Sequence, residues 1–455
     1  SDQSDRPDLS ALCLRIPYTA DAANLLHAWG GEHWFRDPHN VRIMEIPEKP
    51  GQVFSSLDKE LIRTVKELRG SFMPYAFLTG DKRGMAWFAE NDKGWTQSTE
   101  TPALSIERQE NGNVVLTLNI ISEKVDLTKP RTFAFGLHPT PVKKLDPTWR
   151  GWTWWTVSPD SFCGFGMKGE NMDSTQFNRF PESWDLAKKR FDGAAAWGQP
   201  DPGNHPINKR VRGIYYDLRG IGSPPENAKE WWSDWWGYGW HKGSDNLRYT
   251  PELVDFTAYY HNEWVRRGLA YGVYMDDVWN VPQKVVPGPA AYLLPDGHMQ
   301  PGFEWRNQRE SIKRMRQIYY DNGLTPHMCV HCTHTQYPMW LSFFDEMYDG
   351  EDHDLRPAGH PTDFMDYWTP FRLRFHNSQK FGVPPYFHNW IGNSMKDKIG
   401  KMPTWRFQQG RAYAAALLVH DLAWLNRENF AAALGKTWHK WVEPNMLTRP
   451  ENVLV

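Results

Sequence analysis

The sequence predicts an α/β protein in which a β-sandwich, residues 1–145, precedes a TIM-type (β/α)8 barrel, residues 146–455. Strand-like and helix-like patterns alternate through the second part of the chain, which is typical of a parallel sheet. The first part instead carries short runs of β-branched and aromatic residues separated by turn residues. A length of 455 residues is enough for two such domains.

The strands expected in the first domain follow period-2 patterns. Residues 86–95 resemble a hairpin with its turn at residues 91–94. Two further strands are expected at residues 113–121 and 132–137. Residues 139–150 contain three prolines and form the predicted linker to the barrel.

Helices are expected before and after one strand of the second domain. Thr250 and Pro251 suit the start of the first helix, and Gly268 suits its end. The second helix ends at Asn322 and Gly323. The apolar positions that recur at helical spacing are Leu253, Phe256, Tyr260 and Trp264 in the first helix and Ile312, Met315 and Tyr319 in the second.

Six segments of the second domain are predicted strands, and a seventh or eighth is expected near residues 414–425. The six are residues 152–157, 211–217, 270–276, 326–331, 346–350 and 385–389. In a parallel α/β fold the loops after the C-terminal ends of the strands carry the chemistry. Functional side chains are therefore expected at those ends.

Two adjacent carboxylates, Asp276 and Asp277, follow the strand at residues 270–276. Alternation predicts that Tyr274 and Asp276 point to the barrel interior, whereas Val273 and Met275 meet the surrounding helices. We interpret Asp276 and Asp277 as catalytic and Trp279 as a substrate contact.

An upstream strand repeats the arrangement, because Tyr215 and Asp217 have the spacing of Tyr274 and Asp276. Tyr215, Asp217 and Arg219 are therefore predicted substrate-binding residues in the same pocket. The alternative is that Asp217 only caps the helix that follows its strand.

Histidines cluster after the strand at residues 326–331. His327, Cys329 and His331 alternate onto one face, and His334 lies in the loop above. His331 and His334 are predicted to bind sugar hydroxyls. The alternative is a zinc site, although the spacing in the cluster from His327 to His334 matches no strong zinc motif.

Acidic and polar residues also end two later strands. Glu351 is the predicted second catalytic carboxylate, with Asp352 in reserve and His353 beside them, unless this is only a solvated acidic loop. The last predicted strand ends in three substrate-binding candidates, His388, Asn389 and Trp390.

Composition excludes several classes of function. The net charge of −2 creates no field for nucleic acid or an anionic membrane, and no apolar run reaches the roughly 18 residues of a membrane span. Phosphate loops, dinucleotide fingerprints and GxSxG elbows are missing from the sequence. Four cysteines are too few for a disulfide framework.

Tryptophan is unusually frequent, with five residues in 1–150 and 20 in 151–455. Flat aromatic side chains bind the apolar faces of sugar rings, although most of these residues individually suit a core. Together with the acidic strand ends, this abundance favours a carbohydrate ligand.

Three segments carry a resemblance to a known group of proteins. They are residues 84–95 (GMAWFAENDKGW), 135–143 (FGLHPTPVK) and 272–277 (GVYMDD). They resemble glycoside-hydrolase-like proteins with an N-terminal β-sandwich and a catalytic barrel, and most of all the group that includes the β-N-acetylgalactosaminidases and uncharacterised bacterial relatives.

The resemblance implies substrate-assisted catalysis by an adjacent Asp-Glu pair. Carried over, Asp276 would orient the 2-acetamido group of the substrate and Asp277 would be the general acid. This chain has Asp where the group has Glu. The shorter side chain leaves Glu351 as the alternative acid.

We therefore expect a glycoside hydrolase that cleaves a poly- or oligosaccharide by carboxylate acid/base catalysis. The alternatives are a polysaccharide lyase or metal-dependent carbohydrate enzyme that uses the histidine cluster, and a non-catalytic carbohydrate-binding protein. Neither a cofactor nor a metal is expected, and the expected partner is a carbohydrate, with the oligomeric state left open. The polar start of the chain does not resemble a signal peptide, and a secreted or periplasmic location is expected from the function alone.

Overall fold

The computed structural model describes residues 8–29, 41–59, 65, 67–147, 214–218, 251–266, 272–276, 282–283, 290–332, 336–349, 370–375, 380–387 and 419–424. The chain forms two compact units. Unit 1 comprises Ser1–Pro141, Trp240–Thr250 and Asn280–Gln308, and unit 2 comprises Val142–Gly239, Pro251–Trp279 and Arg309–Val455.

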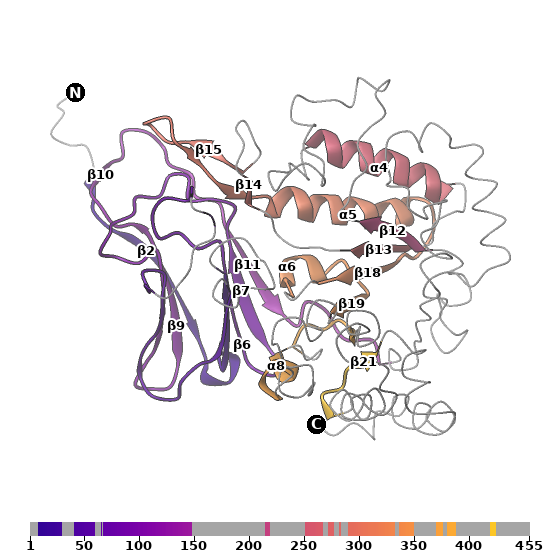
Figure 1. Ribbon diagram of the computed structural model, residues 1–455, viewed down its shortest axis with the longest axis horizontal. Helices are drawn as coiled ribbons and strands as arrows, with labels where there is room; N and C mark the ends of the chain where they lie inside the picture. Colours follow the sequence, from indigo (N-terminus) through magenta and orange to yellow (C-terminus); the bar gives the residue numbers. More distant parts are fainter. Residues whose placement is uncertain are drawn as a thin grey trace, which may run out of the picture. The chain divides into compact units, whose positions relative to one another are not determined.

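Two antiparallel sheets make up most of the described part of unit 1 (Figure 1). The five-stranded sheet has the order β11 (Gly136–Thr140), β7 (Gly84–Phe88), β6 (Tyr75–Thr79), β3 (Leu25–Trp29) and β4 (Val41–Glu45). The four-stranded sheet has the order β2 (Leu12–Tyr18), β9 (Val114–Ile121), β8 (Leu104–Arg108) and β5 (Gly51–Ser55). The short strands β1 (Asp8–Leu9) and β10 (Val125–Asp126) pair with each other, and η2 (Ala20–Ala22) is a 3-10 turn.

The sandwich core is aromatic. Every residue of β6 is buried, and the rings of Phe72, Trp87 and Trp95 contact one another with centroids 5.4 to 6.4 Å apart. The Tyr18 hydroxyl of β2 donates to the Met85 carbonyl of β7 at 3.3 Å, which joins the two sheets. Both main sheets of this unit are antiparallel, as a β-sandwich requires.

One local prediction in this unit is wrong, and one predicted strand has different bounds. Residues 86–95 do not form a hairpin, because β7 pairs with β6 and β11, whereas Trp95 only follows the turn in which its amide donates to the Asp92 carbonyl. The strand expected at residues 132–137 begins later, as β11. Phe135 and Leu137 are each 43% exposed, so the apolar alternation that suggested the earlier strand does not reflect burial.

The segment between β13 and α5 belongs to unit 1 from Asn280 onward. It contains two short antiparallel pairs. The pairs are β14 (Pro282–Gln283) with β17 (Gly302–Phe303), and β15 (Tyr292–Leu293) with β16 (Met299–Gln300).

The described strands of unit 2 form one parallel sheet, in which neighbours in space are also neighbours in sequence. They are β12 (Ile214–Leu218), β13 (Gly272–Asp276), β18 (His327–His331), β19 (Glu346–Asp349), β20 (Pro385–Phe387) and β21 (Ala423–Trp424). Each coincides with a predicted strand, so the parallel α/β sheet is confirmed. Closure into an eight-stranded barrel remains a prediction, and the strand expected at residues 152–157 lies outside the described residues.

Four helices are described: α4 (Pro251–Arg266), α5 (Trp305–Asp321), α6 (Pro338–Leu341) and α8 (Pro370–Phe375). The predictions for α4 and α5 are confirmed. The turn after α5 is closed by the Leu324 amide, which donates to the Tyr319 carbonyl at 2.8 Å, and by Gly323, whose φ is +72°. A positive φ at this position favours glycine.

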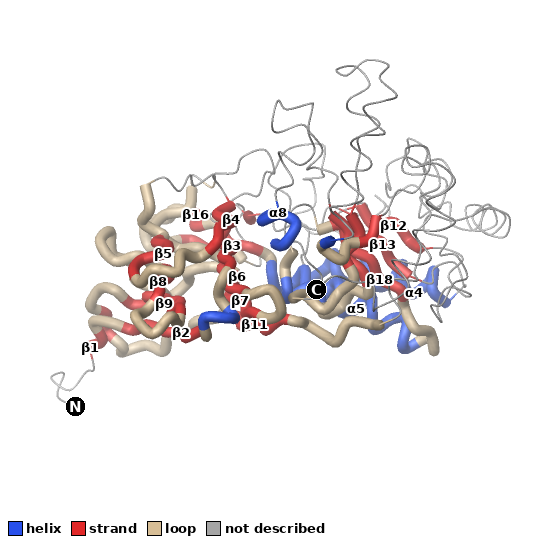
Figure 2. Tube along the Cα trace, turned by 90° about the horizontal axis from the view of Figure 1, so that it is seen from below, coloured by secondary structure: helices blue, strands red, loops and turns tan. Residues whose placement is uncertain are grey.

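Helices α4 and α5 lie side by side along one face of the parallel sheet (Figures 1 and 2). The His261 ring of α4 contacts Tyr319 of α5, with centroids 5.3 Å apart, and Asn322 donates to the Asn262 side chain at 3.0 Å. Within the part of the chain that the structure describes, neither of these helices nor any other is both long and apolar enough to cross a membrane.

Candidate active site

The six parallel strands end along one edge of the sheet, which we call the C-terminal edge. Its strand-ending residues are Leu218, Asp276, His331, Asp349, Phe387 and Trp424. Asp276 and His331 follow the paired residues Met275 and Val330 on adjacent strands. A carboxylate and an imidazole therefore occupy neighbouring positions at the edge where α/β enzymes carry their chemistry.

Register divides the positions of β13, β18 and β19 into two alternating sets. The apolar set comprises Val273, Met275, Met328, Val330 and Met347, all of them at most 2% exposed. The polar set comprises Gly272, Tyr274, Asp276, His327, Cys329, His331, Glu346 and Tyr348. One set thus matches a helix-covered face, and the other carries groups capable of acid/base chemistry.

Three side chains of the polar set are described, and all are buried. Cys329, His331 and Glu346 are each 1% exposed. Cys329 pairs with Tyr274 on one side and Glu346 on the other, whereas His331 pairs with Tyr348. Burying titratable groups costs free energy, and such groups concentrate at functional sites, so we take the polar set as the candidate site.

The register corrects one interpretation of the sequence. Tyr215 lies opposite Val273, and Asp217 lies opposite Met275. The position opposite Asp276 is held by Leu218 instead. The shared sequence pattern predicts that Asp217 and Asp276 lie at equivalent positions of the two strands. In the sheet, Asp217 lies one residue away from the position opposite Asp276.

The remaining predicted site residues divide into two groups. Tyr215, Asp217, Tyr274 and Asp276 are placed by their backbone positions. Those that lie outside the described residues are Asp277, Glu351, Arg219, Trp279, His334, Asp352, His353, His388, Asn389 and Trp390. Their roles stay predictions.

Glu346 was not among the predicted site residues. The acids after β19 drew attention to the loop, yet Glu346 opens the strand and belongs to the polar set. The signal was present in the sequence: Met347 is the apolar member of this strand, so alternation places Glu346 and Tyr348 in the other set.

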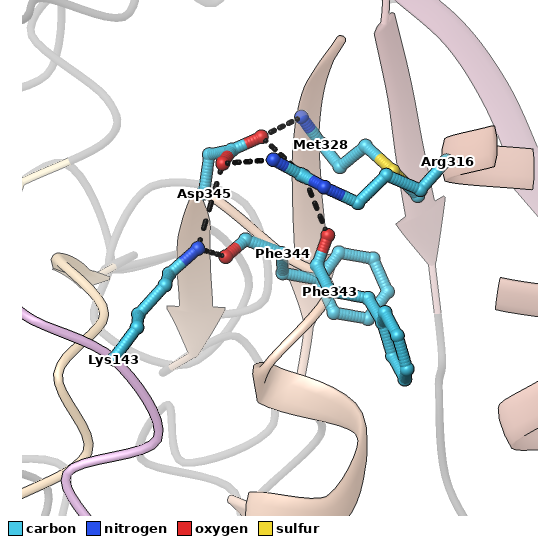
Figure 3. A network of polar contacts seen from close by, with 6 residues as sticks. All are labelled: Lys143, Arg316, Met328, Phe343, Phe344 and Asp345. Atoms are coloured by element: carbon cyan, nitrogen blue, oxygen red, sulfur yellow. Dashed lines mark hydrogen bonds and ion pairs between the residues drawn. The ribbon is translucent and has the colours of Figure 1, made fainter. Parts of the chain in front are cut away.

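The opposite edge of the sheet carries a polar network that fixes the strands (Figure 3). Arg316 of α5 donates to both oxygens of Asp345, at 2.9 and 3.1 Å, and the Met328 amide donates to Asp345 Oδ2 at 3.0 Å. Lys143 donates to the Phe344 carbonyl and to Asp345 Oδ1. These contacts tie α5 to the starts of β18 and β19.

The Lys143 ammonium is affected by two opposing influences. Burial lowers its pKa, and the Asp345 carboxylate works in the other direction. Lys143 and Asp345 lie at the starts of the strands, whereas the chemistry of α/β proteins lies at the strand ends, so we assign these charges to packing.

Metal-ligating residue types do not gather in threes or more among the residues that the structure describes. His327 and His331 belong to β18, and His334 of the same predicted cluster lies outside the described residues. Within the described part, Cys13 is exposed, whereas Cys329 and Cys332 are buried.

No protein-family model and no curated protein matches the chain. Similar solved structures include a GH36 α-galactosidase variant from Geobacillus stearothermophilus in complex with 1-deoxygalactonojirimycin (TM-score 0.38, 8% identity, 95% of this chain and 63% of that chain). An α-galactosidase from Lactobacillus brevis has a TM-score of 0.38 at 12% identity, over 94% of this chain and 59% of that chain.

A third similar structure is a cycloalternan-degrading enzyme from Trueperella pyogenes, with a TM-score of 0.40 at 10% identity, over 95% of this chain and 66% of that chain. The chain therefore spans 59 to 66% of the length of these structures. The resemblance to the β-N-acetylgalactosaminidase group stays a prediction.

Proposed function

We propose that the protein is a glycoside hydrolase whose active site lies at the C-terminal edge of the parallel sheet. The observation that carries this proposal is the polar set, in which Asp276 and His331 end adjacent strands above the buried residues Cys329 and Glu346. The high tryptophan content of the second part of the chain suits a sugar ligand.

Glycosidic cleavage needs two carboxyl groups with different protonation states. One donates a proton to the leaving oxygen, and the other acts as base or nucleophile from about 5 to 10 Å away, depending on the stereochemical outcome. Adjacent strands are about 4.8 Å apart. The strand β18 lies between β13 and β19, so the backbones of β13 and β19 are about 10 Å apart. We propose Glu351, which follows β19 in the sequence, as the second carboxylate.

The roles within the acidic pair follow from the proposed variant of the mechanism. In substrate-assisted cleavage, Asp276 orients a 2-acetamido group, which attacks the anomeric carbon, and Asp277 protonates the leaving oxygen. In the ordinary two-carboxylate mechanism, Asp276 or Asp277 works with Glu351. His331 would bind a sugar hydroxyl in either case.

Extracellular or periplasmic glycans are the substrates we propose.

Substitution of the acidic pair tests the proposal. Asp276→Asn and Asp277→Asn should each lower kcat by about 10²- to 10⁴-fold, because an amide neither donates a proton nor carries the negative charge. Turnover would be measured on a glycan panel, with products analysed by mass. Asp255→Asn is the matched control, since Asp255 is an exposed residue of α4 paired with Arg314.

The outcomes separate the alternatives. Full activity in both variants would show that the catalytic carboxylates lie elsewhere. An unsaturated product, or loss of activity with a chelator, would instead indicate a lyase or a metal-dependent enzyme using the histidine cluster. Binding of glycans by the wild type without any product would indicate a carbohydrate-binding protein.

A further inference from the structure

Glu346 is a buried carboxylate whose place in the sheet follows from two separate observations. Asp345 before it binds Arg316 of α5, and Met347 after it belongs to the apolar set and is 2% exposed. Alternation along these three residues therefore places Glu346 on the side of the sheet away from α5. Register independently pairs Glu346 with Cys329 of β18. Both observations assign the carboxylate to the polar set.

The polar set forms two rows across β13, β18 and β19. One row consists of three residues that pair in register, Tyr274, Cys329 and Glu346. The other row lies two residues further along each strand, nearer the C-terminal edge, and consists of Asp276, His331 and Tyr348. From the usual spacings along and between strands, the backbones of Glu346 and Asp276 are about 12 Å apart. All six residues belong to unit 2.

A cation at the start of the sheet compensates the charge of Glu346. Burial lowers the pKa of Lys143, and the carboxylates of Asp345 and Glu346 oppose that shift. Lys143 also donates to the Phe344 carbonyl, which holds its ammonium beside the start of β19. Ionising a buried carboxyl is costly, whereas a nearby cation favours the ionised form. Lys143 therefore favours a negative charge on Glu346.

A negative charge in this row suits the chemistry of glycosidic cleavage. The transition state resembles an oxocarbenium ion, so positive charge develops on the sugar ring. A fixed carboxylate stabilises that state more than it stabilises the neutral substrate. Over about 12 Å, at an effective dielectric constant of about 20, the interaction corresponds to about a tenfold change in rate. Glu346 can thus serve the reaction without contacting the sugar.

We propose that Glu346 is an ionised, buried carboxylate that stabilises positive charge on a sugar bound at the strand ends of Asp276 and His331. Its role in turnover rests on the proposed function. The charge of Glu346 and its compensation by Lys143 do not, because they depend only on the arrangement of groups within unit 2.

Three variants of the full-length chain separate charge from shape. Glu346→Gln removes the charge at constant side-chain length and should lower kcat about tenfold, with KM changed by less than about twofold. Glu346→Asp keeps the charge and should recover most of kcat. Met347→Leu is the control, because Met347 is also buried on β19 but belongs to the apolar set. Its kcat should stay within about twofold of the wild type.

A charged ligand tests the same interaction without turnover. The probe is a protonated piperidine iminosugar, and its neutral lactam is the matched control, both with the ring configuration of the sugar released from the glycan panel. Glu346→Gln should weaken binding of the iminosugar about tenfold and change binding of the lactam by less than about twofold, because only the iminosugar carries a positive charge. Calorimetric titration measures both affinities.

The coupling between Lys143 and Glu346 is measurable without any ligand. Lys143→Gln should raise amide hydrogen exchange of a peptide covering residues 327–332, because Lys143 and the Met328 amide share Asp345 as an acceptor. That rise should be at least about threefold smaller in the presence of Glu346→Gln, since the cation then has one anionic neighbour fewer.

Glu346→Met replaces Glu346→Gln if the latter does not fold, because it removes the charge without burying an amide. Wild-type kcat in the uncharged variant, or equal losses of kcat in Glu346→Gln and Glu346→Asp, would overturn the electrostatic role. Equal weakening of iminosugar and lactam binding would do the same.

Exchange decides the charge of Glu346 separately. Rises that simply multiply in the double variant would overturn its compensation by Lys143. A wild type that releases no sugar from any glycan would count against the proposed function, and the exchange measurement would then stand on its own.

Discussion

At the scale of single residues, His261 shows how a buried ring sets a response to pH. Burial lowers its pKa from 6.5 to about 3, whereas the unfolded chain binds a proton near the ordinary value. Because the folded pKa is the lower one, stability is fully present above about pH 6.5 and is lost as the pH falls toward 3.

Replacing His261 should make the free energy of unfolding less dependent on pH below pH 7. The wild type should lose about 2 kcal/mol of unfolding free energy between pH 7 and pH 5 through His261 alone, because the unfolded state gains the proton. His261→Phe should lack that loss while keeping an aromatic ring against Tyr319. Urea unfolding at the two pH values measures the difference, and an equal slope in both proteins would contradict the assignment.

The candidate site was predictable where it depended on one strand at a time. The position of Asp276 at a strand end, and the burial of Val273 and Met275, follow from alternation along residues 270–276. The position of Asp217 relative to Asp276 could not be predicted in this way, because register is set by hydrogen bonds between strands. A difference of one residue exchanges the two alternating sets.

At the scale of elements, two arginines of helix α5 form ion pairs with aspartates in different environments. Arg316 and Asp345 have side chains 18% and 16% exposed, and Asp345 also accepts from the Met328 amide. Arg314 and Asp255 have side chains 45% and 55% exposed and join α5 to α4. The two ion pairs should therefore contribute different amounts to the free energy of unfolding.

Truncating each aspartate separates the two environments. Asp345→Ala should lower the free energy of unfolding by about 3 kcal/mol, because it leaves a largely buried guanidinium and a strand amide without their acceptor. Asp255→Ala should cost about 0.5 kcal/mol or less, as is usual for exposed ion pairs. Denaturant titration of both variants provides the comparison, and equal losses would show that burial does not control the contribution of these pairs.

Element boundaries depended on packing that the sequence pattern does not contain. Strand β11 begins at Gly136, opposite Phe88, and a Cβ atom at Gly136 would lie 2.2 Å from the Phe88 ring. A side chain at this position would require the Phe88 ring to move, which favours glycine. Of the predicted strand at residues 132–137, only Gly136 and Leu137 belong to β11, although the whole run has strand-like alternation.

At the scale of the whole molecule, the two units have separate supporting contacts. Arg108 contacts carbonyls of unit 1, and the network of Asp345, Arg316 and Lys143 lies in unit 2. Contacts that share no partner usually contribute additively to stability.

Hydrogen exchange should therefore report each unit independently. Arg108→Gln should raise exchange in β8 and β9 but not in β18 and β19, and Asp345→Ala should do the reverse, because local opening follows local contacts. The double variant should show both effects at their single-variant size. Spread of either effect through both units would mean that they unfold as one cooperative body.

The sequence by itself determined the type and order of the main elements, because periodicity and helix-end residues act locally: the helices before and after β13, the parallel strands, and the acidic strand end at Asp276. Tertiary structure decided what depends on distant partners. It set the one-residue register between β12 and β13, placed Glu346 beside Cys329, and joined residues 290–306 to the sandwich through Asp92 and Glu90. These relations arise from hydrogen bonds between segments far apart in the chain, which no local pattern encodes.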